Sequence, residues 1–181
     1  MLEGTHVKVV PLDAAAHAGA LYAGSREPEL WRYLFNGPYN LEAEFGEWLE
    51  GREKSEDPLF FTILDAASGA PAGYCSLMRI ETAHRVIEVG NILYLPCLQR
   101  TVGATEAMYL LARYVFEELG YRRYEFLSQR AASQSIEVSV HDPSGIGGNH
   151  GRIVGRCGRG RDKSCDHCEN YGWAGGEEFH L

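Results

Sequence analysis

The feature that most restricts the fold is an unbroken succession of strand, short turn and long helix in the middle of the chain. An apolar strand runs from about Val86 to Tyr94, and a turn follows at 99–105. Apolar positions at three- and four-residue spacing then predict a helix from about Thr105 to Leu119. A further strand is expected at Arg122–Leu127. Such a crossover places its two strands parallel to one another in the same sheet.

The chain before this unit predicts two helices and three more strands. An opening strand at His6–Leu12 leads into a helix that Asp13 caps and that continues to about Ala23. A second helix fits Leu41–Leu49. Strands at Leu59–Leu64 and Ala72–Leu77 form a hairpin and, with the strand after them, three consecutive antiparallel strands. We therefore predict an α/β fold with a mixed, mostly antiparallel sheet flanked by helices.

Composition limits the class of protein and its partners. The chain has 181 residues, enough for one domain with a sizeable core, and its net charge of −8 argues against nucleic acid as a partner. No apolar run has the roughly 18 residues that a membrane helix needs, and the start of the sequence lacks a secretion signal. We expect a cytoplasmic protein that binds no membrane. Cys75 and Cys97 lie in apolar stretches and are expected in the core.

The last third of the chain differs in kind, so we divide the sequence into a core at 1–127 and a tail at 128–181. The tail holds 10 of the 21 glycines and lacks a long helical or strand period, which predicts loops or disorder. It also carries residue types that zinc accepts: Cys157, Cys165, His167, Cys168 and His180. Because only one pair has the two-residue spacing of a metal knuckle, no metal site is expected.

The turn between strand and helix has the chemistry of an anion site. The first amides of a helix lack partners within the helix and carry partial positive charge, which suits a diphosphate. Gly103 and Ala104 would let the backbone approach phosphate oxygens, Thr105 would cap the helix and donate a hydroxyl, and Arg100 adds charge. The alternative is an ordinary connection between a strand and a helix that happens to contain a glycine.

Several runs along the chain resemble one family of enzymes. They resemble, in family order, the RimJ/RimL-like branch of the GNAT acetyltransferases at Glu88–Ile92, Pro96, Gln99–Thr101, Thr105–Met108 and Leu119–Arg123. The resemblance covers about residues 5 to 125. The closing helix and strands of the family are not recognisable after Glu125, so the C-terminal part of the fold is expected to be missing or replaced.

The resemblance implies acetyl-CoA as co-substrate and direct attack of a primary amine, from a protein N-terminus or a small molecule, on its thioester. It implies that the coenzyme A pyrophosphate binds at Gln99, Arg100, Thr101, Val102, Gly103, Ala104 and Thr105, and that the pantetheine arm pairs with the strand at Ile92 and Tyr94. Glu88, the carboxylate of that strand, is the candidate general base. Its alternative role is an ion pair with Arg79 or Arg85.

The acceptor cleft and two other functions remain open at this point. By the resemblance, the early aromatic residues Trp31, Tyr33, Phe35 and Tyr39 line the cleft, with core packing as the alternative. The histidines His17 and His84 are not expected to act as bases. The rival functions are a non-catalytic coenzyme A-binding remnant from a frameshifted or mis-spliced gene, and a zinc-binding interaction module formed by the tail. We expect a monomer or a homodimer.

Overall fold

The computed structural model of the chain describes residues 1–130, 134–141 and 152–157. Within these residues, eight strands form one sheet and follow one another in chain order. They are β1 (Leu2–Glu3), β2 (Val7–Pro11), β3 (Leu59–Asp65), β4 (Pro71–Glu81), β5 (Val86–Tyr94), β6 (Arg123–Arg130), β7 (Gln134–His141) and β8 (Arg152–Cys157). Neighbouring strands are antiparallel except β5 and β6, which are parallel. The predicted mixed sheet and its crossover are confirmed.

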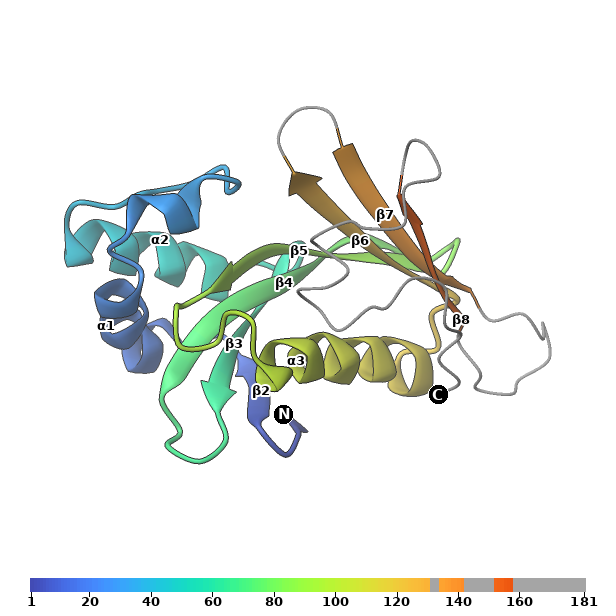
Figure 1. The fold of residues 1–181 in the computed structure, drawn as a ribbon, viewed down its shortest axis with the longest axis horizontal. Coiled ribbons are helices and arrows are strands. Elements are labelled where there is room, and N and C mark those ends of the chain that lie inside the picture. Colours follow the sequence, from blue (N-terminus) through green and yellow to red (C-terminus); the bar gives the residue numbers. More distant parts are fainter. Residues whose placement is uncertain (131–133, 142–151, 158–181) are drawn as a thin grey trace.

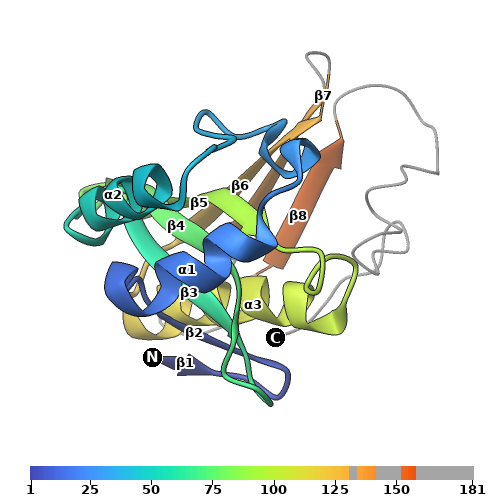
Figure 2. The same cartoon turned by 90° about the vertical axis from the view of Figure 1, so that its left-hand side faces the viewer.

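Helices cover both faces of the sheet (Figure 1). They are α1 (Ala14–Gly24), the short 3-10 helix η1 (Pro28–Trp31), α2 (Glu42–Glu53), α3 (Val102–Arg113) and the π-helical turn η2 (Tyr114–Glu118) that continues α3. Figure 2 shows the same fold from the end at which α1 and α2 lie. The predicted flanking helices are therefore present.

Two apolar clusters lie on opposite faces of the sheet because successive side chains of a strand point to opposite sides. On β3, Phe61 and Ile63 belong to the cluster beneath α3, whereas Phe60 belongs to the cluster beneath α1 and α2. On β4, Leu77 and Tyr74 divide in the same way. The strands are buried on both sides, which explains their nearly continuous apolar sequence.

The predicted start is correct for α1 and wrong for α3. The Asp13 carboxylate accepts a hydrogen bond from the Ala16 amide at 2.9 Å, so the predicted cap of α1 is confirmed. The cap of α3 is Thr101 and not Thr105, and the helix begins three residues earlier than expected. The first turn carries the exposed Val102 and the small residues Gly103 and Ala104, which give it no apolar period.

The end of α3 and one cysteine also differ from expectation. The Leu119 amide donates to the Tyr114 carbonyl oxygen at 3.0 Å, five residues back, which widens the last turn. Leu119, the last residue of the predicted helix, has an exposed side chain. Cys75 is buried, and burial raises the pKa of its thiol to about 12. Cys97 is exposed, so its predicted place in the core is wrong.

Part of the tail forms strands, contrary to the expectation of loops. β7 pairs with β6 from Gln134 to His141, and β8 pairs with β7 from Arg152 to Cys157, so both extend the sheet. The strands expected to be missing are thus partly present. Of the candidate zinc ligands, Cys157 is the last residue of β8, and the other four lie outside the described residues. The division of the chain at residue 127 stays a prediction.

In the described part of the chain, no helix has both the length and the apolar character needed to cross a membrane.

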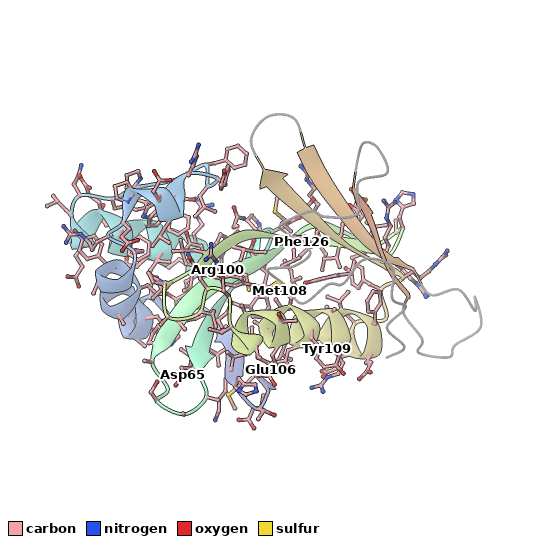
Figure 3. All side chains as sticks on the ribbon, viewed as in Figure 1. Asp65, Arg100, Glu106, Met108, Tyr109 and Phe126 are labelled. Carbon is pink, nitrogen blue, oxygen red and sulfur yellow. The ribbon has the colours of Figure 1, made fainter. Side chains whose placement is uncertain are left out.

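One carboxylate on α3 holds the start of the chain against the fold. Glu106 accepts hydrogen bonds from the amides of Thr5 at 2.8 Å, His6 at 2.7 Å and Val7 at 3.0 Å. Figure 3 shows Glu106 on the side of α3 that faces this segment. Burial tends to raise its pKa, but the three hydrogen bonds together outweigh that effect and leave the pKa lowered from its ordinary value of 4.5.

We expect Glu106→Gln to lower the free energy of unfolding by about 1–2 kcal/mol, a modest loss because the carboxylate is partly exposed to solvent. The folded-state pKa of Glu106 is lowered, so its stabilisation is present above pH 4.5 and is lost as the pH falls through the folded-state value. Urea denaturation at several pH values measures both effects. Glu117→Gln, at an exposed position of η2, which continues α3, is the control, and equal losses in the two variants would contradict the prediction.

Candidate active site

The parallel strands β5 and β6 pair over a short length and then separate. Their register runs from Val86–Arg123 to Val89–Phe126. From Gly90 onward, β5 has no β6 partner in the described chain, while β6 continues alongside β7 (Figure 1). The β5 segment from Gly90 to Tyr94 is therefore open in the sense that it has no β6 neighbour in the described chain. The backbone at Ile92 can pair with an extended ligand there, whereas the Tyr94 carbonyl already accepts from Gln99. The predicted binding residues Ile92 and Tyr94 lie in this open segment.

Hydrogen bonds fix the turn that leads from this open segment into α3. The Thr101 hydroxyl donates to the Leu98 carbonyl at 2.7 Å and accepts from the Ala104 amide at 3.3 Å. The Gln99 side chain donates to the Tyr94 carbonyl at 3.1 Å. The Tyr94 hydroxyl donates to the Ala104 carbonyl at 3.2 Å. The end of β5 and the first turn of α3 thus form one braced unit.

The start of α3 offers amides and positive charge to an anion. Val102 and Gly103 are the first two helical residues after the cap, and their amides precede the first bond within the helix. Arg100 has a φ of +59° and an exposed side chain at the same turn (Figure 3). Thr105 is exposed one helical turn further on. The structure therefore brings together the residues that the sequence assigned to a phosphate group.

Gly103 is small for a different reason from the one expected. A Cβ built on Gly103 would lie 3.0 Å from Val7 Cγ1 and 3.3 Å from Leu98 Cδ1. Ala104 is also buried, with 1% of its surface exposed. The close packing of the helix start on β2 and on the turn therefore accounts for the small size of both residues.

Glu88 is a buried carboxylate just before the point where β5 leaves β6. It is 5% exposed and lies between Ile87 and Val89, which face α3, so its side chain points to the opposite face of the sheet. Arg79 Nη1 lies 2.9 Å from Glu88 Oε2, which makes the ion pair that the sequence left as an alternative. Burial raises the pKa of Glu88, Arg79 opposes that rise and Glu125 adds to it, with a raised pKa as the result. A carboxylate of this kind is suited to accept a proton near neutral pH.

Two polar residues beside Glu88 were not found from the sequence. Asn91 has a φ of +49° and interrupts the regular ladder between β4 and β5. Its side-chain amide donates to the Ser76 hydroxyl at 2.9 Å, and that hydroxyl donates to the Gly90 carbonyl at 3.2 Å. The sequence signal was the Gly90–Asn91 pair inside an apolar strand, which is typical of a bulge.

The four aromatic residues predicted for the acceptor cleft separate into two pairs. Trp31 is buried and its indole donates to the Ser25 carbonyl at 2.7 Å, and Tyr39 packs edge-on against it at 5.4 Å between ring centres. Tyr33 and Phe35 are 50% and 91% exposed. Trp31 and Tyr39 thus contribute to packing under α1 and α2, while Tyr33 and Phe35 have surface to offer an acceptor.

The two histidines make contacts of a structural kind. His17 Nδ1 lies 3.0 Å from the Thr62 hydroxyl and joins α1 to β3, and burial lowers the pKa of this imidazole. His84 is exposed in the turn before β5, with Nδ1 3.7 Å from Glu81. That neither histidine acts as a base stays a prediction.

A hollow of about 590 Å³ lies on another side of the turn. Its walls come from the N-terminal segment, the β3–β4 turn and the β5–α3 turn, and no residue of β5 or β6 lines it. It shares Thr101, Val102 and Gly103 with the candidate anion site but contains neither Glu88 nor the open edge of β5. The hollow is therefore distinct from the candidate site formed by Glu88, the open segment of β5 and the start of α3. Among the described residues, no three His, Cys, Asp or Glu side chains gather as a metal site.

Comparison with known proteins agrees with this geometry. The chain is 43% identical to a GCN5-related N-acetyltransferase from Brucella melitensis, with a TM-score of 0.69, and the match covers 73% of this chain and 61% of that one. It is 34% identical to a GNAT-family acetyltransferase from Chromobacterium violaceum, with a TM-score of 0.65 and coverage of 70% and 64%. The chain thus spans less than two thirds of either structure's length.

A more distant structure shares the fold. Spermidine N-acetyltransferase from Vibrio cholerae, solved with CoA and spermine, is 18% identical, with a TM-score of 0.56 and coverage of 68% of this chain and 72% of that one. No functionally curated protein matches the chain. The family model described as acetyltransferase (GNAT) domain matches residues 6–141, three quarters of the sequence. The chain therefore belongs to the GNAT acetyltransferase family.

Proposed function

We propose that this protein is an acetyl-CoA-dependent N-acetyltransferase of the RimJ/RimL-like kind, which acetylates the primary amine of a protein N-terminus or a small molecule. The observation that carries the proposal is the arrangement along β5. A buried carboxylate, an open strand edge and the start of α3 follow one another from Glu88 to Val102. They match the three parts of the reaction, which are proton acceptor, thioester arm and pyrophosphate.

For the donor, the turn residues Gln99–Thr105 and the exposed Arg100 would hold the pyrophosphate of acetyl-CoA. The pantetheine arm would run along β5 at Ile92 and Tyr94, beyond the last residue of β5 that pairs with β6. This path leads the thioester toward Glu88. The solved spermidine N-acetyltransferase contains CoA, which supports coenzyme A as the ligand of the shared fold.

For the reaction, the acceptor nitrogen would attack the thioester carbonyl carbon. A bond from nitrogen to carbon forms, the carbon–sulfur bond breaks, and the thiolate of coenzyme A leaves and takes up a proton. Glu88 would accept the proton that the amine loses, directly or through a water molecule. The exposed rings of Tyr33 and Phe35 would contact the acceptor, and the net charge of −8 is compatible with a cationic amine.

Calorimetric titration with acetyl-CoA, followed by a thiol-release assay over a panel of amines and N-terminal peptides, tests the proposal. We expect one acetyl-CoA bound per chain and thiol release with at least one class of amine. Binding without turnover over the whole panel would favour the non-catalytic coenzyme A-binding remnant. Absence of acetyl-CoA binding would contradict both the active N-acetyltransferase and the non-catalytic remnant.

A further inference from the structure

Strand β4 contains an irregularity opposite Glu88. The register between β4 and β5 shifts between Met78 and Glu81, and Arg79 has a φ of +50°, a conformation that residues other than glycine seldom adopt. The carboxylate of Asp57 accepts from the Arg79 amide at 3.0 Å and from the Ile80 amide at 3.1 Å. One side chain therefore satisfies both amides of the bulge.

The bulge changes the face to which Arg79 points. In a regular strand, Leu77 and Arg79 would share one face and Met78 and Ile80 the other. Instead, Leu77 and Ile80 both pack into the cluster beneath α3. Met78 pairs with Glu88, and Arg79 reaches the same carboxylate, so both lie on the opposite face. Without the bulge, the guanidinium would be on the wrong side of the sheet.

The two oxygens of Glu88 have different surroundings. Oε2 accepts from Arg79 Nη1 at 2.9 Å. Oε1 lies 3.9 Å from the position that a Cβ on Gly90 would occupy. Oε1 therefore lies on the sheet face above Gly90, the first residue of β5 beyond its pairing with β6 and next to the segment where the thioester arm is proposed to lie.

Charged groups on the neighbouring strands act on Glu88 in opposite directions. Glu125 of β6 is in register with Glu88 and opposes its ionisation, and Glu125 itself pairs with Arg123. Burial also opposes the charged form of Glu88. Arg79 of β4 is the cation in direct contact with the carboxylate. Without Arg79, burial and Glu125 would raise the pKa of Glu88 further.

We propose that Asp57 and Arg79 are positioning residues for Glu88. Asp57 fixes the β4 bulge, the bulge holds the Arg79 guanidinium on Oε2, and the pair keeps the carboxylate ionised with Oε1 free to take the amine proton. This proposal rests on the proposed function, in which Glu88 is the base. It assigns a role in the reaction to a contact that would otherwise only neutralise a buried charge.

The first test is Arg79→Met, compared with Arg85→Met. Both arginines have a positive φ next to the β4–β5 turn, and both side chains are exposed. Arg85 makes no ion pair within the described part of the chain. We expect Arg79→Met to lower kcat/KM about three- to tenfold near pH 6 and to recover toward the wild-type value near pH 9, because Glu88 would ionise only at higher pH. Arg85→Met should follow the wild-type profile.

The second test is Asp57→Asn, compared with its exposed neighbour Glu56→Gln. The amide offers one acceptor oxygen in place of two, so the bulge loses one of its two hydrogen bonds. We expect the pH profile of Asp57→Asn to shift in the same direction as that of Arg79→Met, by a smaller amount, and Glu56→Gln to leave it unchanged. Thermal unfolding of each variant checks that the chain is folded.

A titration that does not need turnover completes the experiment. The carbon-13 signal of the Glu88 carboxyl, assigned by its absence in Glu88→Gln, is followed with pH in the wild type and in Arg79→Met. The proposal is supported if the midpoint rises in Arg79→Met together with the acid limb of kcat/KM. It is overturned if the carboxyl midpoint stays in place, or if it rises while the acid limb does not. Full activity of Glu88→Gln would instead refute Glu88 as the base, while the carboxyl titration would still report on Arg79.

Discussion

Glu88→Gln is expected to lower turnover of the best amine by about a hundredfold or more, the range found when a general base is removed. The amide cannot accept a proton, yet it keeps nearly the size and shape of the carboxylate. The affinity for acetyl-CoA should stay within about twofold of the wild type, because Glu88 lies on the side of the sheet away from α3. Steady-state thiol release and calorimetry measure the two quantities separately.

The same substitution should not lower the thermal midpoint at pH 7. The folded-state pKa of Glu88 is raised, so the carboxyl group favours folding most below its ordinary value of 4.5, and this contribution is lost as the pH rises through the folded-state value. A neutral amide removes that dependence, and the partner Arg79 remains solvated because 63% of its side chain is exposed. Loss of activity together with loss of folding would mean that Glu88 is a structural residue.

Val102→Pro is expected to weaken acetyl-CoA binding by about tenfold or more, because it deletes one amide that is proposed to hold the pyrophosphate. Proline is well tolerated at the first position of a helix, where the amide has no partner within the helix. The preceding residue Thr101 has extended backbone angles of −111° and 161°, which suit the position before a proline. The helix should therefore persist while one donor is lost.

Val102→Ala is the matched control, since it shortens the same exposed side chain and keeps the amide. It should bind acetyl-CoA like the wild type. The thermal midpoints of the two variants should agree within a few degrees, which shows that α3 is intact. Equal affinity of Val102→Pro and Val102→Ala for acetyl-CoA would show that this amide does not contact the pyrophosphate.

Regular elements of the fold were predictable from the sequence because burial gives them a period. The strands β3 and β5, the cap of α1 at Asp13 and the parallel crossover through α3 all follow from apolar spacing and helix-start chemistry. The turn at 99–105 was likewise found from its place between a strand and a helix.

Features that depend on tertiary contacts were not predictable in this way. The cap at Thr101 was missed because the first turn of α3 carries small residues that pack on β2. The bulges at Arg79 and Asn91 break the alternation of their strands, and the partner that holds the first of them, Asp57, comes from another segment. A side chain that binds backbone amides 22 and 23 residues away leaves no periodic signal.

Amide hydrogen exchange with and without acetyl-CoA tests the central claim most directly, because it reports where on the molecule the ligand lies. We expect protection in peptides covering 90–94 and 99–105, the open edge of β5 and the start of α3, and little change at 65–72. Protection at the N-terminal segment and at 65–72, which line the other hollow beside the turn, without protection at 90–94 would contradict the account.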